Sequence, residues 1–339
     1  MMPLLINENS SLEEGRPSPV GTAPLQCSYN LFQEPWWLDA VAPGAWAEAT
    51  VRKGEEVVAR LPYILKQRMG LRVTTQPKLT PNLGPWMRAT GAKYANRLGD
   101  EKNMLNALIE QLPSADLFRQ NFAPQVTSWL PFHWAGYQVS VSCTYRIPNL
   151  RDLESVWENC LSNIRGYVLK AKKTLTVRDD LSMDRLMEVT EMTFRRQNCA
   201  QPFSRELVSR IDEACGTRQC RKALFAEDGQ GRIHAVAYIV WDSEAAYYLL
   251  SGADPDLRNS GASSLLLWEA IRYASTVTKA FDFEGSRIEP IERFFRAFGG
   301  QQIPYYCVKK TGRRMRALLG LHNFTAALTG FEIASLKGL

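Results

Sequence analysis

The segment from Ala246 to Tyr306 constrains the fold most, because apolar runs alternate there with helical patterns. The run from Tyr247 to Leu250 is typical of a buried strand, and Pro255 ends it. Another such run begins at Phe281. Between the two, apolar residues recur at helical spacing, at Leu265, Trp268, Ala270, Ile271 and Ala274. We predict the order strand, glycine-containing loop, helix, strand, helix, strand.

The loop between the first strand and the helix is a candidate anion site. Gly261 and its small neighbours let the backbone turn tightly and approach a ligand. The start of a helix presents unpaired N–H groups and the positive end of the helix dipole. We therefore predict that the loop binds an anionic cofactor or donor through Arg258, Asn259, Ser260, Gly261, Ala262 and Ser263.

The composition is that of a soluble globular protein. The chain has 339 residues, which suffice for two domains with their own cores. Apolar residues make up 45% and charged residues 22%, both ordinary values. The formal net charge of +6 favours anionic ligands without requiring nucleic acid.

The cysteines and histidines argue against a metal site. The seven cysteines are scattered without a C-x-x-C pair, and the three histidines lie far apart. We expect reduced cysteines, a cytoplasmic location and no metal. The N-terminus lacks the pattern of a secretory signal, and residues 1–26 are expected to form a loose arm. The apolar stretches of residues 317–339 are interrupted by polar residues and glycines, so we expect a helical tail rather than a transmembrane segment.

The first half of the chain reads as strands with one or two helices. We predict strands at Thr50–Arg52, Val57–Arg60 and Tyr63–Leu65, with Lys53–Glu56 as a hairpin turn. Pro62 indicates an edge strand, since proline cannot donate to a ladder. Further along we predict a helix over Asn103–Leu112, a strand beginning at Leu117, a loop over Trp129–Trp134 and a strand over Gly136–Arg146.

Trp86 closes a turn-rich segment that starts at Thr80. Its ring either anchors a surface loop or forms a wall of a substrate-binding groove.

The second half begins after a linker at Ile147–Asp152, where Asn149 or Asp152 is a candidate helix cap. Basic residues from Arg165 to Lys173 then recur at helical spacing. They form either a solvated face or a clamp for phosphate groups of a ligand, with Arg165 as a candidate contact. Amphipathic helices are predicted at Leu181–Arg195 and Phe203–Ala214, the second with Ser204 as a candidate cap. Strands are predicted at Lys222–Glu227 and Ile233–Trp241, joined by a hairpin turn at Asp228–Gly231. Together these elements predict a mixed α/β fold.

The loop sequence Arg258-x-x-Gly261-x-Ser263 resembles the pyrophosphate loop of GNAT-type N-acyltransferases. The usual form is Gln/Arg-x-x-Gly-x-Gly/Ala, so Ser263 departs from it. Three other stretches resemble the second domain of the narrower Fem-type branch, which includes aminoacyl-tRNA-dependent transferases. These are Asn163-Ile-Arg-Gly-Tyr-Val-Leu-Lys, Phe281-Asp-Phe-Glu-Gly-Ser and Phe294-Phe-Arg-Ala-Phe-Gly-Gly.

The resemblance spans roughly residues 120–310 and implies two tandem GNAT-like domains, each a mostly antiparallel sheet flanked by helices. We place the degenerate first domain at 27–147 and the acyltransferase domain at 148–316. In GNAT-type proteins, helices such as the one beginning near Phe203 border the acceptor, which makes Phe203 a candidate substrate contact.

Four residues are candidates for catalysis. Asp282 and Glu284 lie two apart on a predicted strand, so their carboxylates would share one face. They either accept a proton from the amine or serve as solvated or structural carboxylates. Fem-type proteins commonly have a lysine at the position of Arg296, thought to offset charge at the transferred acyl group. Tyr305 could protonate the leaving group.

Three functions remain open at this stage. The first is transfer of an acyl group from acyl-CoA to a small-molecule or peptide amine. The second is aminoacyl-tRNA-dependent transfer to a cell-wall precursor, which the basic residues of Lys309–Arg316 could assist by binding tRNA or an anionic surface. The third is a GNAT-like binding protein without catalysis.

Overall fold

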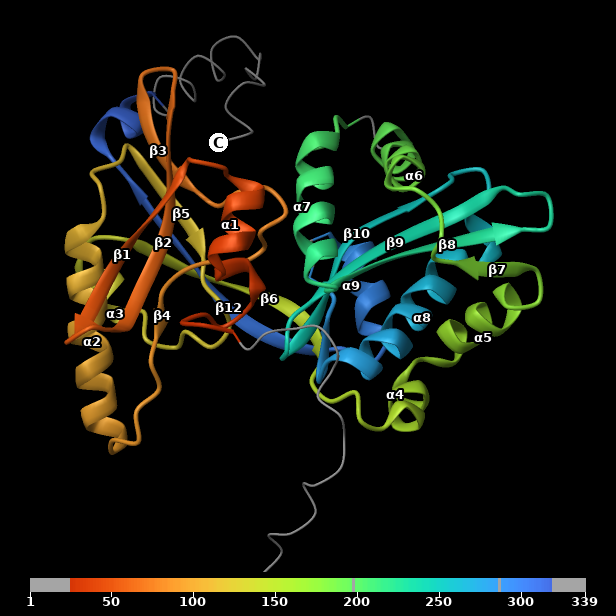
Figure 1. The fold of residues 1–339 in the computed structure, drawn as a ribbon, viewed down its shortest axis with the longest axis horizontal. Helices are drawn as coiled ribbons and strands as arrows, with labels where there is room; N and C mark the ends of the chain where they lie inside the picture. The colour runs from red at the N-terminus through yellow and green to blue at the C-terminus, as the bar shows by residue number, and fades with distance from the viewer. Residues whose placement is uncertain (1–24, 197–198, 286–287, 319–339) are drawn as a thin grey trace, which may run out of the picture.

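The computed structural model describes residues 25–196, 199–285 and 288–318. Most of the predicted N-terminal arm, 1–26, and most of the predicted tail, 317–339, lie outside these residues. In the described part, the chain forms one mixed sheet in the order β1-β2-β3-β5-β12-β6-β11-β10-β9-β8-β7, with β4 paired to β2 (Figure 1). Most neighbouring strands are antiparallel, and helices flank the sheet, so the predicted mixed α/β fold with a mostly antiparallel sheet is confirmed.

The first half contributes the strands on one side of the sheet and three α-helices. Its elements are η1 (Leu31–Gln33), α1 (Pro35–Val41), β1 (Trp46–Lys53), β2 (Glu56–Arg68), β3 (Leu71–Thr75), β4 (Trp86–Met87), α2 (Tyr94–Gln111), β5 (Leu117–Asn121), α3 (Leu130–Trp134) and β6 (Gln138–Ile147).

The second half contributes the strands on the opposite side, together with β12, which lies between β5 and β6. Its elements are α4 (Leu153–Asn159), α5 (Ser162–Ala171), β7 (Leu175–Arg178), α6 (Met183–Arg196), α7 (Arg205–Thr217), β8 (Arg221–Asp228), β9 (Ile233–Trp241), β10 (Ala245–Ala253), η2 (Arg258–Ser260), α8 (Ala262–Val277), β11 (Ala280–Asp282), α9 (Glu289–Arg296) and β12 (Gln301–Thr311).

The order of elements repeats between the two halves. Apart from the two-residue strand β4 and the short helix η2, the series β1-β2-β3-α2-β5-α3-β6 has the same order of strands and helices as β8-β9-β10-α8-β11-α9-β12. In both series the third strand pairs in parallel with the fourth across a helical connection, β3 with β5 and β10 with β11. The last strands are exchanged, because β6 pairs with β11 while β12 pairs with β5. The two halves therefore share one continuous sheet.

Helices cover both faces of the second half (Figure 1). Helix α8 packs on β9 and β8 from one side, and α6 packs on β10 and β9 from the other. The nine buried residues of α8 include Leu265, Leu266 and Trp268. Each such large apolar side chain contributes about 1.5–3 kcal/mol when fully buried. The rings of Trp157 on α4 and Trp268 lie 4.6 Å apart, which ties α4 to this core.

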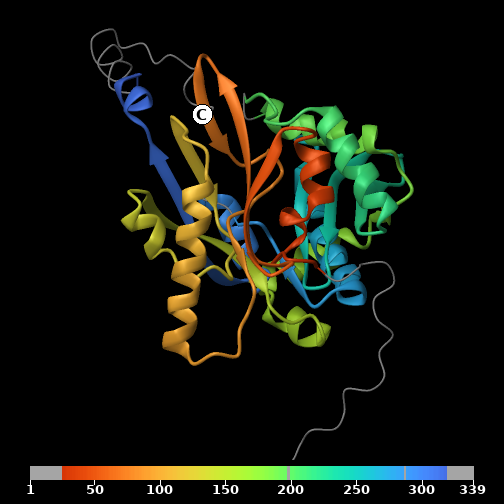
Figure 2. The same cartoon turned by 60° about the vertical axis from the view of Figure 1, so that its left-hand side comes forward.

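The first half has a separate, smaller core between the sheet and helices α2 and α3 (Figure 2). Leu105 and Leu108 are the buried residues of α2, and they pack in this cluster with Phe118 and Phe132. Helix α1 turns away from it and packs against α7, where the Arg210 guanidinium donates to the carbonyl of Ala40 at 2.8 Å.

The structure confirms the predicted alternation from β10 to β12, the Lys53–Glu56 hairpin and the caps at Asp152 and Ser204. Other predictions need correction. Residues Val57–Arg60 and Tyr63–Leu65 belong to one strand, β2, which is not at the edge of the sheet. Pro62 fits there because β1 alone pairs at that position: β4 pairs only as far as Arg60, and β3 pairs only from Leu65.

The segment Trp129–Trp134, predicted to be a loop, contains the short helix α3. Pro131 lies in the first turn of this helix, where its missing N–H has no helical partner to lose.

Candidate functional site

Strands β10 and β11 separate shortly after they meet. Their parallel register covers only Ala245↔Ala280, Ala246↔Phe281 and Tyr247↔Asp282. Strand β10 continues to Ala253. The segment that follows β11 instead runs along β6, where the N–H of Phe283 donates to the carbonyl of Tyr145 at 2.9 Å. Beyond Tyr247, one edge of β10 therefore has no neighbouring strand in the described part of the chain.

A β-bulge at Leu249 lies at the mouth of this opening. The register with β9 runs from Tyr248↔Ile239 to Leu250↔Tyr238, so Leu249 has no counterpart on β9. A bulge of this kind leaves the extra residue unpaired and re-aims its neighbours. The backbone N–H of Leu249 is consequently a candidate donor to a ligand in the opening.

The other side of the opening is a tight turn at Glu284 and Gly285, with φ of 64° and 60°. A Cβ at Gly285 would lie 2.5 Å from the carbonyl oxygen of Cys143, so only glycine allows the chain to run this close to β6. Such left-handed backbone is unusual for glutamate and occurs where surrounding structure enforces it. The turn fixes the Glu284 side chain at the edge of the opening.

The two candidate carboxyl groups have different environments. Asp282 is buried, accepts a hydrogen bond from the Thr144 hydroxyl and also accepts one from the backbone N–H of Glu284 at 2.9 Å. Glu284 lines the cavities described below, and its Oε1 is shielded from solvent without a hydrogen-bond partner among the described residues. The strand alternation that predicted a common face does not extend to Glu284, because β11 ends at Asp282 and Glu284 itself has a left-handed backbone.

Burial is the main cause of the altered protonation of both groups. It raises the pKa of Asp282, although the Thr144 hydrogen bond and the positive charge of Arg146 oppose it. It raises the pKa of Glu284 well above the ordinary value, with further help from the charge of Asp282 and opposition from Arg146. Glu284 therefore holds its proton more tightly than an exposed glutamate does.

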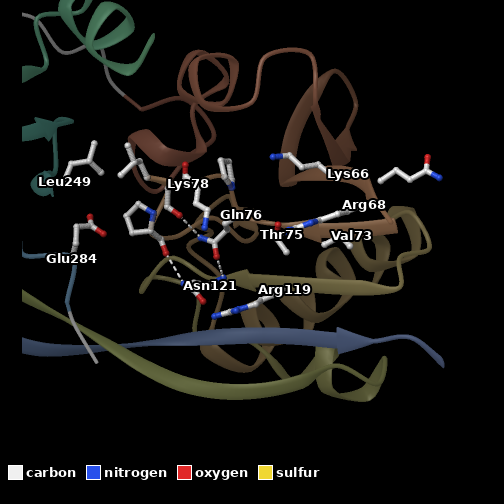
Figure 3. A pocket seen from close by; sticks show the side chains of 15 residues that line it. Lys66, Arg68, Val73, Thr75, Gln76, Lys78, Arg119, Asn121, Leu249 and Glu284 are labelled. Carbon is white, nitrogen blue, oxygen red and sulfur yellow. Dashed lines mark hydrogen bonds between the residues drawn. The ribbon is translucent and has the colours of Figure 1, made fainter. Parts of the chain in front are cut away.

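A groove of about 740 Å³ opens from Glu284 and Leu249 across the first half of the sheet (Figure 3). Glu284 and Leu249 stand at one end, and Lys66 and Arg68 at the other. A cavity of about 200 Å³ adjoins it, since Arg119, Asn121 and Glu284 border both. Tyr305 lines this smaller cavity, so the structure brings two of the four predicted catalytic residues, Glu284 and Tyr305, to one space.

A separate cavity of about 350 Å³, the donor cavity of the proposal below, lies at the start of α8. Its walls come from α6, β10 with the residues that follow it, the predicted anion loop, and α9. They are Thr193, Arg196, Tyr248, Ser251, Gly252, Ala253, Asp254, Pro255, Arg258, Ser263, Pro290, Ile291, Phe294 and Phe295. Arg258 and Ser263, at the two ends of the predicted loop, thus face an open space into which the unpaired N–H groups of a helix start can point.

The middle of the loop packs against α5. Gly261 has φ of 80°, and a Cβ there would lie 2.7 Å from the carbonyl oxygen of Tyr167. Ala262 is buried, and its N–H points to the Ser260 hydroxyl at 3.4 Å. Gly261 is therefore required first for the contact between the loop and α5.

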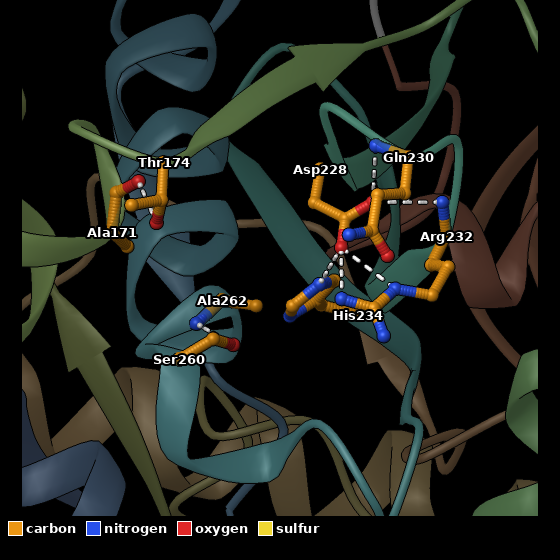
Figure 4. A network of polar contacts seen from close by, with 8 residues as sticks. All are labelled: Ala171, Thr174, Asp228, Gln230, Arg232, His234, Ser260 and Ala262. Carbon is orange, nitrogen blue, oxygen red and sulfur yellow. Dashed lines mark hydrogen bonds and ion pairs between the residues drawn. The ribbon is translucent and has the colours of Figure 1, made fainter.

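The β8–β9 hairpin supports the loop from another side (Figure 4). The Asp228 carboxylate lies 3.0 Å from Nε2 of His234 and 2.8 Å from Nε of Arg232, and these contacts hold the pKa of Asp228 well below its usual range. The backbone of His234 in turn accepts a hydrogen bond from the N–H of Asp254 at 3.0 Å. This network fixes the chain between β10 and the loop.

Four predicted site residues lie elsewhere. Arg165 donates to the carbonyls of Glu158 and Cys160, at 2.8 and 2.6 Å, and so caps the end of α4. Arg296 pairs with Glu292 at 2.9 Å and lines none of the three cavities described above. Trp86 pairs with β2, and Phe203 packs edge-on against Phe194. Arg165, Trp86 and Phe203 do not line these cavities either.

The first half supplies groove residues that the sequence pattern did not identify. They include Lys78, Arg119 and Asn121. Arg119 and Asn121 lie on one face of β5, separated by the buried Gln120, and this alternation was the available signal. Leu249 was read simply as part of a buried strand, since a bulge leaves no mark in its own residue type.

The fold is mixed α/β, and the candidate site lies at a split between parallel strands next to a helix start. Residues 159–287 match the family model of the acetyltransferase (GNAT) domain, which confirms the predicted resemblance and supports acyltransferase activity. A search among curated proteins found no match.

Solved structures with the same fold extend over most of the chain. The crystal structure of FemX matches with a TM-score of 0.61 and 13% identity, covering 82% of this chain and 92% of FemX. The C-terminal domain of a protein described as a lysylphosphatidylglycerol synthetase from Agrobacterium fabrum matches with a TM-score of 0.51 and 15% identity, covering 85% of this chain and 90% of that one. The predicted likeness to the Fem-type branch is therefore confirmed at the level of the fold.

Two further findings concern the described residues only. None of their helices has the length and hydropathy needed to cross a bilayer. None of their histidine, cysteine, aspartate and glutamate side chains gather in threes or more as a metal site would require.

Proposed function

We propose that the protein is an N-acyltransferase that transfers an acyl group from acyl-CoA to an amine. The observation that carries the proposal is the position of two successive residues of β10. Tyr248 borders the cavity at the start of α8, while Leu249 borders the groove that contains Glu284. An acyl donor bound in the cavity at the start of α8 would have to reach only across the edge of β10 to meet an acceptor in the groove that contains Glu284.

The donor cavity suits a long molecule with phosphates at one end. Arg258 and the first N–H groups of α8 favour negative charge. From there, the unpaired edge of β10 offers backbone groups to an extended, amide-containing arm, as an exposed strand edge does for peptides. Phe294 and Ile291 give the cavity an apolar wall.

Glu284 is proposed as the general base. A raised pKa makes its carboxylate a better proton acceptor near neutral pH than an ordinary glutamate. The amine attacks the acyl carbonyl as Glu284 takes its proton, so that a C–N bond forms. The C–S bond then breaks, and the thiolate takes a proton either from protonated Glu284 or from Tyr305. In the second case Glu284 passes its proton to the Tyr305 phenolate. Both routes return the enzyme to its starting state.

The N–H of Leu249 is proposed to stabilise the oxyanion that develops on the acyl carbonyl. It belongs to a bulge on a strand otherwise paired with β9, so its position is fixed before the ligand arrives. Loss of one oxyanion donor costs about 10²–10³ in rate in enzymes where it has been removed.

We expect coenzyme A and acetyl-CoA to raise the melting temperature of the protein, because a ligand that binds only the native state stabilises it. Aminoacyl-tRNA is the comparison ligand. Stabilisation by aminoacyl-tRNA with none by acetyl-CoA would overturn the choice of donor and favour the tRNA-dependent alternative.

Replacing Ser263 with aspartate is expected to weaken binding of coenzyme A at least tenfold without lowering stability. The new carboxylate occupies the first turn of α8, where it would repel phosphate yet interact favourably with the helix dipole, by about 0.3–1 kcal/mol. Isothermal titration gives the affinity and thermal melting the stability.

The Ser263→Ala variant is the matched control, since it removes the hydroxyl without adding charge. Unchanged affinity in Ser263→Asp would show that phosphates do not bind at the start of α8.

A further inference from the structure

The groove in front of Glu284 carries more positive charge than amine binding requires. Its lining includes Lys66, Arg68, Lys78 and Arg119, against the single carboxyl group of Glu284. None of the four basic side chains has an ion-pair partner among the described residues. Elsewhere on the described surface, arginines such as Arg88, Arg178 and Arg272 do have such partners.

Neighbouring acids do not neutralise this charge. Glu284 is biased towards its neutral form by burial. Asp116 immediately precedes β5. Its carboxylate accepts a hydrogen bond from the N–H of Arg72 at 2.9 Å and lies 3.6 Å from the Arg314 guanidinium. The unpaired cations raise the local concentration of anions and would pair with an anionic group on a bound molecule.

The wall that holds Lys78 is preformed. Gln76 donates to the carbonyl of Thr80 at 3.0 Å and accepts from the N–H of Asn121 at 2.6 Å. Asn121 then donates to the carbonyl of Pro81 at 3.1 Å, and Leu79 adopts a left-handed φ of 57°. Strained backbone held by surrounding hydrogen bonds is common at ligand-binding sites.

The sheet topology brings this wall to Glu284. Strands β3 and β5 are parallel, and Gln76, Lys78 and Asn121 stand at or just beyond their carboxyl ends. Strands β10 and β11 are the other parallel pair, and Leu249 and Glu284 lie beyond the point where they separate. Ligands of α/β sheets bind in crevices outside the carboxyl ends of parallel strands. Both crevices open here into the same groove (Figure 3).

We propose that the groove binds an amine that also carries an anionic group, a phosphate or a carboxylate, held by Arg68, Lys78 and their basic neighbours while the amine lies at Glu284. This inference rests on the proposed function for the role of the amine. The anion-binding part stands on the groove alone and can be tested without any acyl transfer.

The first experiment measures binding of pyrophosphate to the full chain by titration calorimetry. It uses Ser263→Asp as the parent, so that the start of α8 does not contribute. We expect Arg68→Glu/Lys78→Glu in this parent to raise the dissociation constant at least tenfold. The control, Lys53→Glu/Lys93→Glu, makes the same change of charge at exposed positions outside the groove and is expected to change it less than twofold.

Equal weakening by both double variants, or no pyrophosphate binding to the parent, would overturn the groove as an anion site. Thermal melting of each variant verifies that it is folded. Failure of the acyltransferase proposal would appear separately, as absence of acetyl-CoA binding to the unmodified chain.

The second experiment identifies the anion, with acetyl-CoA as donor and the unmodified chain as enzyme. Ethanolamine, phosphoethanolamine and β-alanine are compared as acceptors. We expect at least one anionic amine to exceed ethanolamine tenfold in kcat/KM, and Arg68→Glu/Lys78→Glu to abolish that preference. A preference for phosphoethanolamine indicates phosphate, one for β-alanine indicates carboxylate, and equal or higher turnover of ethanolamine contradicts the proposal.

Discussion

Replacing Glu284 with glutamine is expected to lower kcat/KM for acyl transfer by about 10²–10⁴, the usual contribution of a positioned general base. Glutamine keeps the size and polarity of the side chain but cannot accept a proton from the amine. The turn at Glu284 and Gly285 should persist, because it is set by the close approach to Cys143. Steady-state kinetics with acetyl-CoA measures the loss, and acetyl-CoA binding by the variant verifies that the donor site is intact.

The pH profile separates a base from a structural carboxyl group. Because burial raises the pKa of Glu284 well above its ordinary value, kcat/KM should increase with pH through a range above that of an exposed glutamate. This limb should vanish in Glu284→Gln. The control is Glu289→Gln, which alters an exposed acid on α9 and should keep the limb. An unchanged profile in Glu284→Gln would remove Glu284 from the mechanism.

As pH rises, the free energy of unfolding should decrease while kcat/KM increases. A raised native-state pKa means that the folded protein favours the neutral carboxyl, and that this stability is fully present below the unfolded value of 4.5. It is lost as pH rises through the native pKa, where the buried group must ionise. Glu284→Gln stays neutral throughout, so its melting temperature should gain on the unmodified protein as pH rises. A constant difference between pH 4 and pH 8 would contradict this.

The elements of the second half could be predicted from sequence because each has a local signal. The Asp152 and Ser204 caps, the hairpin after Asp228 and the apolar period of α8 all act within a few residues. The pairing of β12 with β5 and β6 carries no such signal. This pairing joins residues near 305 to residues near 120 and 140. Whether two similar halves exchange their last strands depends only on which strand edge of each half is free to pair.

The candidate site shows the same limit. The loop Arg258–Ser263 could be predicted, because glycine and small residues before a helix indicate a tight turn that a ligand can approach closely. The role of Glu284 depends on a left-handed turn that its residue type does not favour. Charge and spacing made Arg165 a candidate for either a solvated face or a phosphate contact, yet its partners are carbonyl groups at the end of a preceding helix. Backbone acceptors of this kind are invisible in a pattern of side chains.

Replacing Gly261 with alanine is expected to cause a large loss of stability. The left-handed backbone costs an L-residue about 1–2 kcal/mol. The new Cβ would also lie 2.7 Å from the carbonyl oxygen of Tyr167, an atom of the α5 backbone that cannot rotate away. Overpacking of this kind adds about 1–3 kcal/mol. Chemical denaturation should therefore show a loss of about 2–5 kcal/mol from the sum of both effects.

Gly166→Ala provides the matched control on the facing helix. Gly166 lies inside α5, and a Cβ there would meet nothing within 4 Å. Alanine should stabilise that helix by about 0.5–1 kcal/mol, so the same chemical change has opposite signs on two elements in contact. If Gly261→Ala were as stable as the unmodified protein, α5 would not pack on the loop. The α8 start would then be free to move, and the donor cavity would lose the rigid wall that makes it a binding site.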